Sequence, residues 1–285
     1  MNRKIEILVP VDFSKEAIFG LRTALDIAKT VKGTIHLLHV IDEPEGTDFH
    51  LGGDITENEK SYQENYRYTA ELIARQRERL RGVAIKYHNP NVPVEIAVES
   101  GLYKKGLKRY LENHNIDIIV MGTTGETSIS ELFTGNYTEQ AVRVAEIPVL
   151  AVQKYHSPLR FNKLLLGLDL KEYDHRPVRL IKKVARLLNM KILVTHVKQN
   201  KDAIVEDILE YLKRFVQAHD ITDYTLIVAD KGKVPDIIQK VAREYDADII
   251  ATITEGETGI IRLLFGSNTD KIMESTEKPV LAVRE

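Results

Sequence analysis

Short apolar runs alternate along the chain with longer stretches in which apolar positions recur every three or four residues. In the first half, the apolar runs are rich in β-branched residues and span 5–11, 34–40, 92–98, 116–121 and 149–152. Stretches such as 16–31 and 106–113 have helical spacing between them. Strands that alternate with helices form parallel sheets, and strands that are apolar at nearly every position are covered on both faces. The pattern therefore predicts an α/β fold with a doubly wound, Rossmann-like parallel sheet.

The second half of the chain repeats the first. Residues 116–152 and 247–283 align without a gap at an offset of 131, with 17 of 37 positions identical. Nearer the start of each half, 7–12 matches 164–169 and His39-Val40 matches His196-Val197, both at an offset of 157. Repetition over so long a stretch indicates duplication of one structural unit. We expect two such domains in tandem, at 1–155 and 160–285, with a polar linker around Pro158.

The two offsets differ by 157 − 131 = 26 residues, which indicates an insertion in the first domain between residue 40 and about residue 94, between strands two and three. Within it, 57–81 has the spacing of an amphipathic helix with a solvated face. The acidic segment before it, 42–56, is either solvated surface or a lid over the strand ends.

Composition limits the class of protein. Hydrophobic residues make up 43% and charged residues 29% of the 285 residues, as in globular proteins with real cores. The formal charge of −2 argues against a general nucleic-acid binder. No apolar stretch is long enough for a membrane span or signal peptide, and the absence of cysteine fits a reducing compartment. We therefore expect a cytoplasmic protein.

Candidate chemistry follows the fourth strand of the first domain. Gly122 and Gly125 precede nine residues and then Gly135, Asn136 and a helical pattern that includes Thr138. Glycines allow close backbone approach, and free N–H groups at a helix start favour phosphate. Asp12, at the end of the first strand, is placed to accept hydrogen bonds from a ribose, since ligands of such sheets lie at the carboxyl ends of the strands. Together these residues outline a nucleotide site.

This combination of a strand-end Asp, a G-x2-G pair, nine residues and a further Gly resembles the universal stress protein family (UspA-like), in its ATP-binding branch. The PVLAV strand and the His-Val ending of strand two add to the resemblance, which covers nearly the whole chain twice. It implies an adenine nucleotide alpha hydrolase-like fold, a stress-response role and pairing through the last strand. Carried over by position, the resemblance places a nucleotide (ATP, ADP or AMP, with or without Mg²⁺) on the following residues: Asp12, Val40, Gly122, Gly125, Gly135, Asn136 and Thr138. Asn136 departs from the Ser or Thr that is usual there.

The second domain departs further from the family pattern. Ile253 replaces the first glycine and Glu255 adds a negative charge, which favours the first domain as the nucleotide site. A possible second site keeps the following residues: Asp169, Val197, Gly256, Gly266, Ser267 and Thr269. Of these, Gly266-Ser267 matches the family better than Gly135-Asn136 does.

Several of these residues have plainer interpretations. The three glycines could serve turns only, and Asp12 or Ser14 could simply cap the first helix. His36 and His39 lie three apart on a strand and so point to opposite faces, which argues against a shared metal. His39 and His196 are expected to be partly buried with hydrogen-bonded rings. We expect no metal site and no catalytic residue.

Three functions remain open. The first is an adenine-nucleotide-binding regulator with little or no catalysis. The second is a weak ATPase or ATP-using transferase, although the chain has no Walker-type phosphate loop. The third is a nucleotide-free interaction scaffold. In each case the identical last strands, 148–152 and 279–283, present apolar edges, so we expect them to pair as an intramolecular pseudo-dimer. A further homodimer is compatible with this arrangement.

Overall fold

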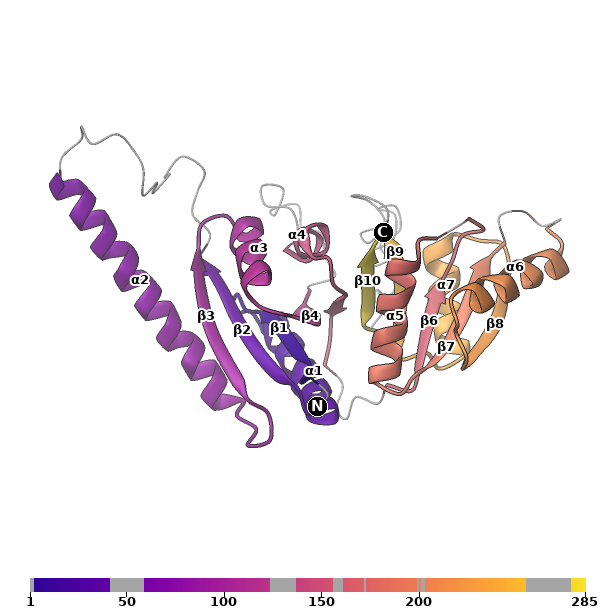
Figure 1. The fold of residues 1–285 in the computed structure, drawn as a ribbon, viewed down its shortest axis with the longest axis horizontal. Helices are drawn as coiled ribbons and strands as arrows, with labels where there is room; N and C mark the ends of the chain where they lie inside the picture. Colours follow the sequence, from indigo (N-terminus) through magenta and orange to yellow (C-terminus); the bar gives the residue numbers. More distant parts are fainter. Residues whose placement is uncertain are drawn as a thin grey trace.

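The computed structural model describes residues 3–41, 59–123, 137–155, 161–171, 173–198, 200, 203–254 and 278–285. The first domain contains β1 (Glu6–Pro10), α1 (Lys15–Val31), β2 (Thr34–Ile41), α2 (Glu59–Lys86), β3 (Val94–Ser100), α3 (Tyr103–Asn113), β4 (Ile118–Gly122), α4 (Tyr137–Val144) and β5 (Val149–Val152). The second contains β6 (Lys163–Gly167), α5 (His175–Leu187), β7 (Lys191–Val197), α6 (Val205–Ala218), β8 (Tyr224–Ala229), α7 (Val234–Glu244), β9 (Ile249–Thr254) and β10 (Val280–Arg284). Figure 1 shows the two domains side by side.

All described strands join one ten-stranded sheet in the order β3-β2-β1-β4-β5-β10-β9-β6-β7-β8. Within each domain every strand pair is parallel. The chain moves outward from β1 to β3 and then returns to the other side of β1 at β4, and the second domain repeats this path from β6. The expected doubly wound fold, present twice, is confirmed. The strand order reverses between β1 and β4 and between β6 and β9, which is where such sheets open a ligand crevice.

Alternating residues of the strands fill two cores, one on each face of the sheet. Ile7 and Val9 face one core with helices α1, α2, α5 and α6, whereas Leu8 faces the other with α3, α4 and α7. Because successive side chains of a strand point to opposite faces, continuous apolar strands are what a sheet covered on both sides requires.

The domains meet through their last strands. β5 and β10 pair antiparallel, with Leu150 opposite Leu281, and both side chains are fully buried. The expected pairing of the two identical strands within one chain is therefore confirmed. Side-chain contacts also cross this boundary, among them those from Arg176 to Glu146 and from Arg284 to the carbonyl oxygen of Arg143.

The insertion in the first domain contains the long helix α2. It has 28 residues, whereas α6 at the equivalent place has 14. Leu80 of α2 is fully buried, while Arg67 and Glu71 form an exposed ion pair, so the expected amphipathic helix is confirmed. In Figure 1, α2 runs alongside the outer strand β3. The lid proposed for 42–56 lies outside the described residues.

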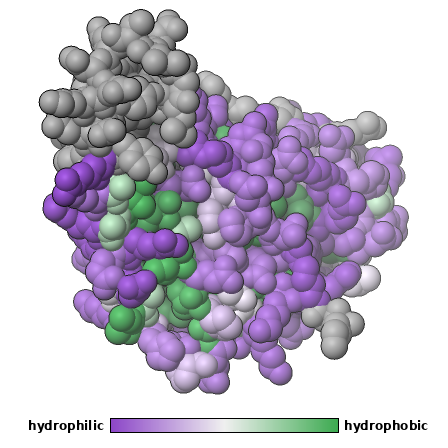
Figure 2. Space-filling view, turned by 60° about the vertical axis from the view of Figure 1, so that its left-hand side comes forward, coloured by the Kyte–Doolittle hydropathy of each residue, from purple (hydrophilic) through white to green (hydrophobic). Residues whose placement is uncertain are grey.

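Figure 2 shows mostly hydrophilic side chains on that face of the molecule, with a limited apolar area. Of the helices that the structure describes, none combines the length and the apolar character needed to cross a membrane.

Candidate functional site

The corner between β1 and α1 presents Asp12 to solvent. Ser14 is the N-cap of α1, and its Oγ accepts a hydrogen bond of 3.0 Å from the N–H of Ala17. Asp12 Oδ1 accepts a 2.9 Å hydrogen bond from the N–H of Ser14. Ser14 thus does the capping that was considered for both residues. The other carboxylate oxygen of Asp12 has no partner among the described residues and is available to a ligand.

Phe13, between these two residues, has an unusual backbone conformation. Its φ is +67°, in the left-handed region that a bulky residue rarely adopts. The side chain lies against the His39 ring at 4.7 Å between centroids, and the Arg79 guanidinium of α2 is 3.9 Å from the Phe13 ring centroid. Such backbone strain costs about 1 kcal/mol or more and persists where the surroundings enforce it. The insertion helix therefore helps to hold the corner that carries Asp12.

His39 ties the end of β2 to the end of β1. Its Nδ1–H donates to the carbonyl oxygen of Val11 at 2.6 Å, and His196 donates to Leu168 at 2.8 Å in the second domain. Burial lowers the pKa of His39, and the charge of Arg79 lowers it further, against the effect of the Val11 carbonyl. The expectation of hydrogen-bonded, buried or half-buried rings at these two positions is confirmed.

Gly122 closes β4 next to the first turn of α1. A Cβ at Gly122 would lie 1.8 Å from the carbonyl oxygen of Glu16, and a Cβ at Gly20 would lie 2.6 Å from the Gly122 nitrogen. The close approach that requires glycine is therefore made by the protein's own helix, independently of any ligand.

The second domain differs at the position equivalent to Gly122. Helix α5 begins at His175, which at the offset of 157 corresponds to Ile18, three residues after the start of α1. Ile253 can therefore stand at the position of Gly122 without meeting the helix, and it packs partly buried against the core. The later helix start thus explains how Ile253 fits the fold at this position.

Two buried hydroxyls without a partner lie on the α3 and α4 side of the first domain's strand ends. They are Tyr103 Oη, at the start of α3, and Thr123 Oγ1, directly after β4. The Tyr103 ring packs against Tyr137 of α4 at 4.5 Å. Burial raises the pKa of Tyr103, so the phenol keeps its proton and can donate. Sequence reasoning missed Tyr103, because its position depends on how α3 packs over the neighbouring strands. Buried hydroxyls are almost always bonded, so this pair suits a polar ligand.

The remaining predicted residues of the first site divide into two groups. Val40 lies at the end of β2, where its side chain packs against Gly106 of α3, and Thr138 is buried in the first turn of α4. The structure thus brings Asp12, Val40 and Gly122 to the carboxyl ends of neighbouring strands. The other three predicted residues lie outside the described part of the chain: Gly125, Gly135 and Asn136.

The second domain has a crevice at its own strand ends. Its lining includes Asp169, Tyr173, Thr195, Val197 and Ile253. Tyr173 Oη accepts a 2.7 Å hydrogen bond from the N–H of Asp169, and burial raises the pKa of Tyr173. Four predicted residues of this site lie outside the described residues: Gly256, Gly266, Ser267 and Thr269.

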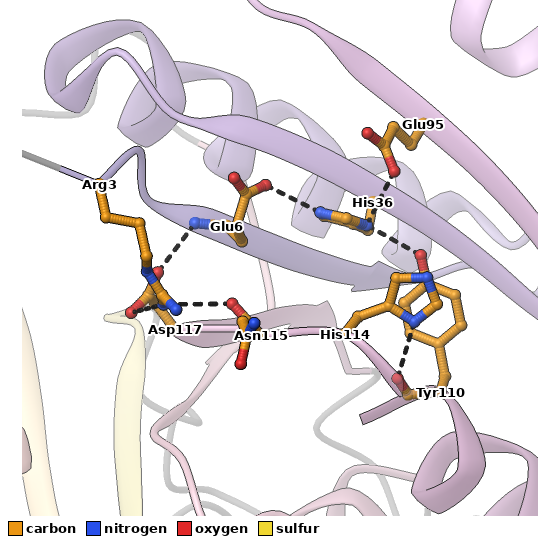
Figure 3. Close-up of polar contacts among 8 residues, drawn as sticks. All are labelled: Arg3, Glu6, His36, Glu95, Tyr110, His114, Asn115 and Asp117. Atoms are coloured by element: carbon orange, nitrogen blue, oxygen red, sulfur yellow. Dashed lines mark hydrogen bonds and ion pairs between the residues drawn. The ribbon is translucent and has the colours of Figure 1, made fainter. Parts of the chain in front are cut away.

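A separate polar network is buried near the amino end of β1 in the first domain (Figure 3). His36 Nε2 lies 2.9 Å from Glu6, and His36 Nδ1 lies 2.8 Å from the hydroxyl of Tyr110. Burial, with nearby acidic residues, raises the pKa of Tyr110 to about 12, so its phenol donates to Nδ1. His36 and His39 have no partner in common, and no three metal-ligating side chains converge anywhere in the described part of the chain.

Comparison with known proteins identifies the relatives of this chain. The Universal stress protein family matches residues 5–153 and 160–284. Universal stress protein MJ0577 of Methanocaldococcus jannaschii is 28% identical over 157 residues, which are 53% of this chain and 96% of that protein. A putative universal stress protein of Staphylococcus aureus is 27% identical over 168 residues, or 58% of this chain and 94% of that protein.

Solved structures share the tandem fold. The crystal structure of a universal stress protein from Archaeoglobus fulgidus matches with a TM-score of 0.65 and 20% identity, covering 98% of this chain and 96% of that one. A putative universal stress protein from Pseudomonas aeruginosa matches with a TM-score of 0.53 and 18% identity, covering 98% and 92%.

Proposed function

Because this chain belongs to the universal stress protein family, we propose that its first domain binds an adenine nucleotide such as ATP and that the protein acts as a stress-response regulator with little or no catalysis. A companion Mg²⁺, a cytoplasmic location and a further homodimer are parts of the same proposal.

The proposal depends on one observation above the others. Asp12 offers an open carboxylate oxygen at the end of β1, and the unpartnered hydroxyls of Tyr103 and Thr123 are buried around the same strand ends. This is where the strand order reverses, the ordinary ligand position in such a sheet. A buried hydroxyl without a partner costs about 1–3 kcal/mol, which a ligand that supplies the hydrogen bonds would recover. Asp12 is suited to ribose hydroxyls, which donate.

Regulation is favoured over turnover by the kind of groups present. In the described ranges around the crevice, Asp12, Tyr103 and Thr123 can accept or donate hydrogen bonds, but no nucleophile is hydrogen-bonded to a base. The nearby imidazole of His39 donates from Nδ1 to Val11. A weak ATPase and a nucleotide-free scaffold are the alternatives.

A retention assay tests the proposal. The purified chain is incubated with ATP and Mg²⁺, and the bound nucleotide and released phosphate are measured per chain. We expect stoichiometric retention with negligible release. Rapid phosphate release would favour the ATPase, and an empty protein would favour the scaffold.

Substitution of Asp12 locates the site. Asp12→Asn keeps an oxygen that can accept from Ser14 but removes the charge, so we expect about tenfold or greater loss of ATP affinity, the loss of one charged hydrogen bond. Asp169→Asn makes the same change at the equivalent strand end of the second domain and is the matched control. Equal ATP affinity in the parent and Asp12→Asn would contradict the assignment.

A further inference from the structure

The charged side chains on the outward face of helix α5 are all positive. In Figure 1, α5 stands beside β10, at the junction of the domains. Buried apolar residues cover the inner side of the helix. On the outer side, exposed basic residues follow one another at steps of three, four and three, which places them in one row along the helix. This α5 basic stripe consists of Arg176, Arg179, Lys183 and Arg186.

No acidic residue of the helix balances the stripe. Among the helices that the structure describes, α5 alone contains no Asp or Glu, although its sequence HRPVRLIKKVARL includes five Arg and Lys residues. Cations three or four positions apart repel each other, and a positive charge in the first turn, such as Arg176, is repelled by the positive end of the helix dipole. The stripe therefore lowers the stability of its own helix. A local rule that is broken without gain to the fold is typical of a functional surface.

Two of the four cations bind carboxylates of the first domain. Arg176 lies 3.0 Å from Glu146, and Lys183 lies 2.6 Å from Asp117. Both cations are about half-exposed, at 43% and 51%. The stripe thus already binds carboxylates that reach it from another part of the chain.

The other two cations are open. Arg179 and Arg186 are exposed, and neither forms an ion pair or hydrogen bond within the part of the chain that the structure describes. They are seven residues apart, which is about 10 Å along a helix. Two guanidinium groups on one rigid element are therefore available to a partner.

The equivalent face of α1 is covered and partly neutralised. At the offset of 157, the two open positions correspond to Arg22 and Lys29, and Asp26 stands between them in place of Lys183. The Arg22 guanidinium lies 3.7 Å from the ring centroid of Tyr155, whose hydroxyl donates to Asp26 at 3.0 Å. The uniform charge of α5 is thus specific to the second domain and is not required by the shared fold.

The residue types on the stripe indicate the kind of anion that it fits. Three of the four are Arg, whose planar fork binds carboxylates with two parallel hydrogen bonds. Single-stranded nucleic acid would need aromatic rings on which bases stack, and a membrane surface would need apolar side chains to insert. None of the large hydrophobic side chains that are exposed in the described ranges lies on α5. An acidic polypeptide segment needs neither feature.

We infer that the α5 basic stripe is a docking surface for an acidic segment of a partner protein, bound by Arg179 and Arg186. Carboxylates on one face of a partner helix recur every three or four residues and so match the spacing of the stripe. The inference does not rest on the proposed nucleotide site, and either proposal can fail alone.

Fluorescence anisotropy of labelled peptides with the full chain tests this inference. The probe is a helical peptide with Glu along one face, and the same peptide with Gln in place of Glu is the uncharged comparison. We expect the Glu peptide to bind more tightly than the Gln peptide, and its binding to weaken as the salt concentration rises. Equal binding of the two peptides would overturn the inference. Tighter binding of single-stranded DNA of the same charge, or of phosphatidylserine vesicles, would show that the acidic protein segment is the wrong partner.

Matched variants locate the binding on α5. Arg179→Gln together with Arg186→Gln removes two exposed charged contacts, so we expect about five- to tenfold weaker binding of the Glu peptide. Arg179→Lys together with Arg186→Lys keeps the charge without the planar fork, and its loss should be smaller. Because both side chains are open, the thermal midpoint should stay equal or rise in each pair, and ATP retention should not change.

The control makes the same change at the equivalent positions of α1. Arg22→Gln together with Lys29→Gln lowers the net charge by the same amount and should leave the affinity for the Glu peptide unchanged. An equal loss in the two glutamine pairs would reveal a general effect of charge and overturn the assignment to α5. Unchanged affinity in Arg179→Gln with Arg186→Gln would overturn it as well.

Discussion

Lys183 donates a 2.6 Å hydrogen bond from its Nζ to Oδ1 of Asp117 and so joins the first helix of the second domain to the start of β4 in the first. Asp117 Oδ2 also accepts from the N–H of Glu6, and Arg3 reaches Oδ1 at 2.8 Å. The equivalent Asp248 accepts from the N–H of Lys163 in the same way. The bond from a backbone N–H to this carboxylate is thus common to both domains, whereas the bond from Lys183 across the boundary is present at Asp117 alone among the described residues.

Replacement of Asp117 by Asn should lower stability in a pH-dependent manner. Burial alone would raise the pKa of Asp117, but the bonds from Lys183, Glu6 and Arg3 outweigh it and hold the pKa below its usual value. The stabilisation is therefore complete above the unfolded pKa of about 4 and is lost as the pH falls through the folded pKa. We expect a loss of about 1–3 kcal/mol at pH 7, measured by urea unfolding, that shrinks towards pH 3.

Two further variants separate the contributions of the ion pair and of the backbone hydrogen bonds. Asp248→Asn keeps an oxygen that can accept from the N–H groups of Asn162 and Lys163, so it should cost less than Asp117→Asn does. Lys183→Met should cost less than about 1 kcal/mol because Lys183 is half-exposed. A loss in Asp117→Asn that stays constant from pH 7 to pH 3 would show that the charge of Asp117 contributes nothing.

Gly122→Ala should destabilise the first domain. The added Cβ would lie 1.8 Å from a backbone oxygen of α1, so the helix must shift, at a cost of about 2–4 kcal/mol. Gly82→Ala is the matched control, since a Cβ there has nothing within 4 Å and alanine favours a helix by about 0.5–1 kcal/mol. Urea unfolding measures both, and equal stability of the parent and Gly122→Ala would refute the packing role of Gly122.

Arg79→Met should raise the pKa of His39. Burial has the largest effect in lowering this pKa, and the positive charge of Arg79 adds to it. Because the folded pKa is lowered, the contribution of His39 to stability is full above about pH 6.5 and falls as the pH drops through that value and towards the folded pKa. NMR titration of the imidazole measures the shift. Arg81→Met, which removes an exposed partner of Glu78, should leave it unchanged, and an unchanged pKa in Arg79→Met would disprove the coupling.

Leu150 and Leu281 should be energetically coupled across the domain boundary. Each is fully buried, so each Leu→Ala change should cost about 2–5 kcal/mol. Because the two residues are paired in register, a double-mutant cycle should give a coupling energy of about 0.5 kcal/mol or more. Additive losses, together with two separate unfolding transitions, would mean that the domains are stable without the shared strand pair.

The periodicity of the sequence was sufficient to predict the fold. The apolar runs at 5–11 and 34–40 became β1 and β2, and the repeat predicted both the tandem domains and the pairing of β5 with β10. These features depend on local spacing and on self-similarity, which a single sequence contains.

The details of the candidate sites were less accessible. The sequence predicts Gly122 as a ligand contact, but the close packing of Gly122 depends on where α1 begins, which no local pattern gives. Nor does any local pattern reveal that Thr195 of β7 and Thr252 of β9 line one crevice, since they are distant in sequence and β6 lies between their strands. The roles of Gly125, Gly135 and Asn136 stay predictions from the family pattern.

The antiparallel junction of β5 and β10 also fixes stoichiometry. A single domain of this kind would present β5 as an open edge, and its assembly would depend on how much protein is present. Here the partner strand is supplied by the same polypeptide, so dilution cannot separate the halves. Every molecule therefore carries the two domains in equal number, and their sequences have been free to diverge while the last strands stay paired.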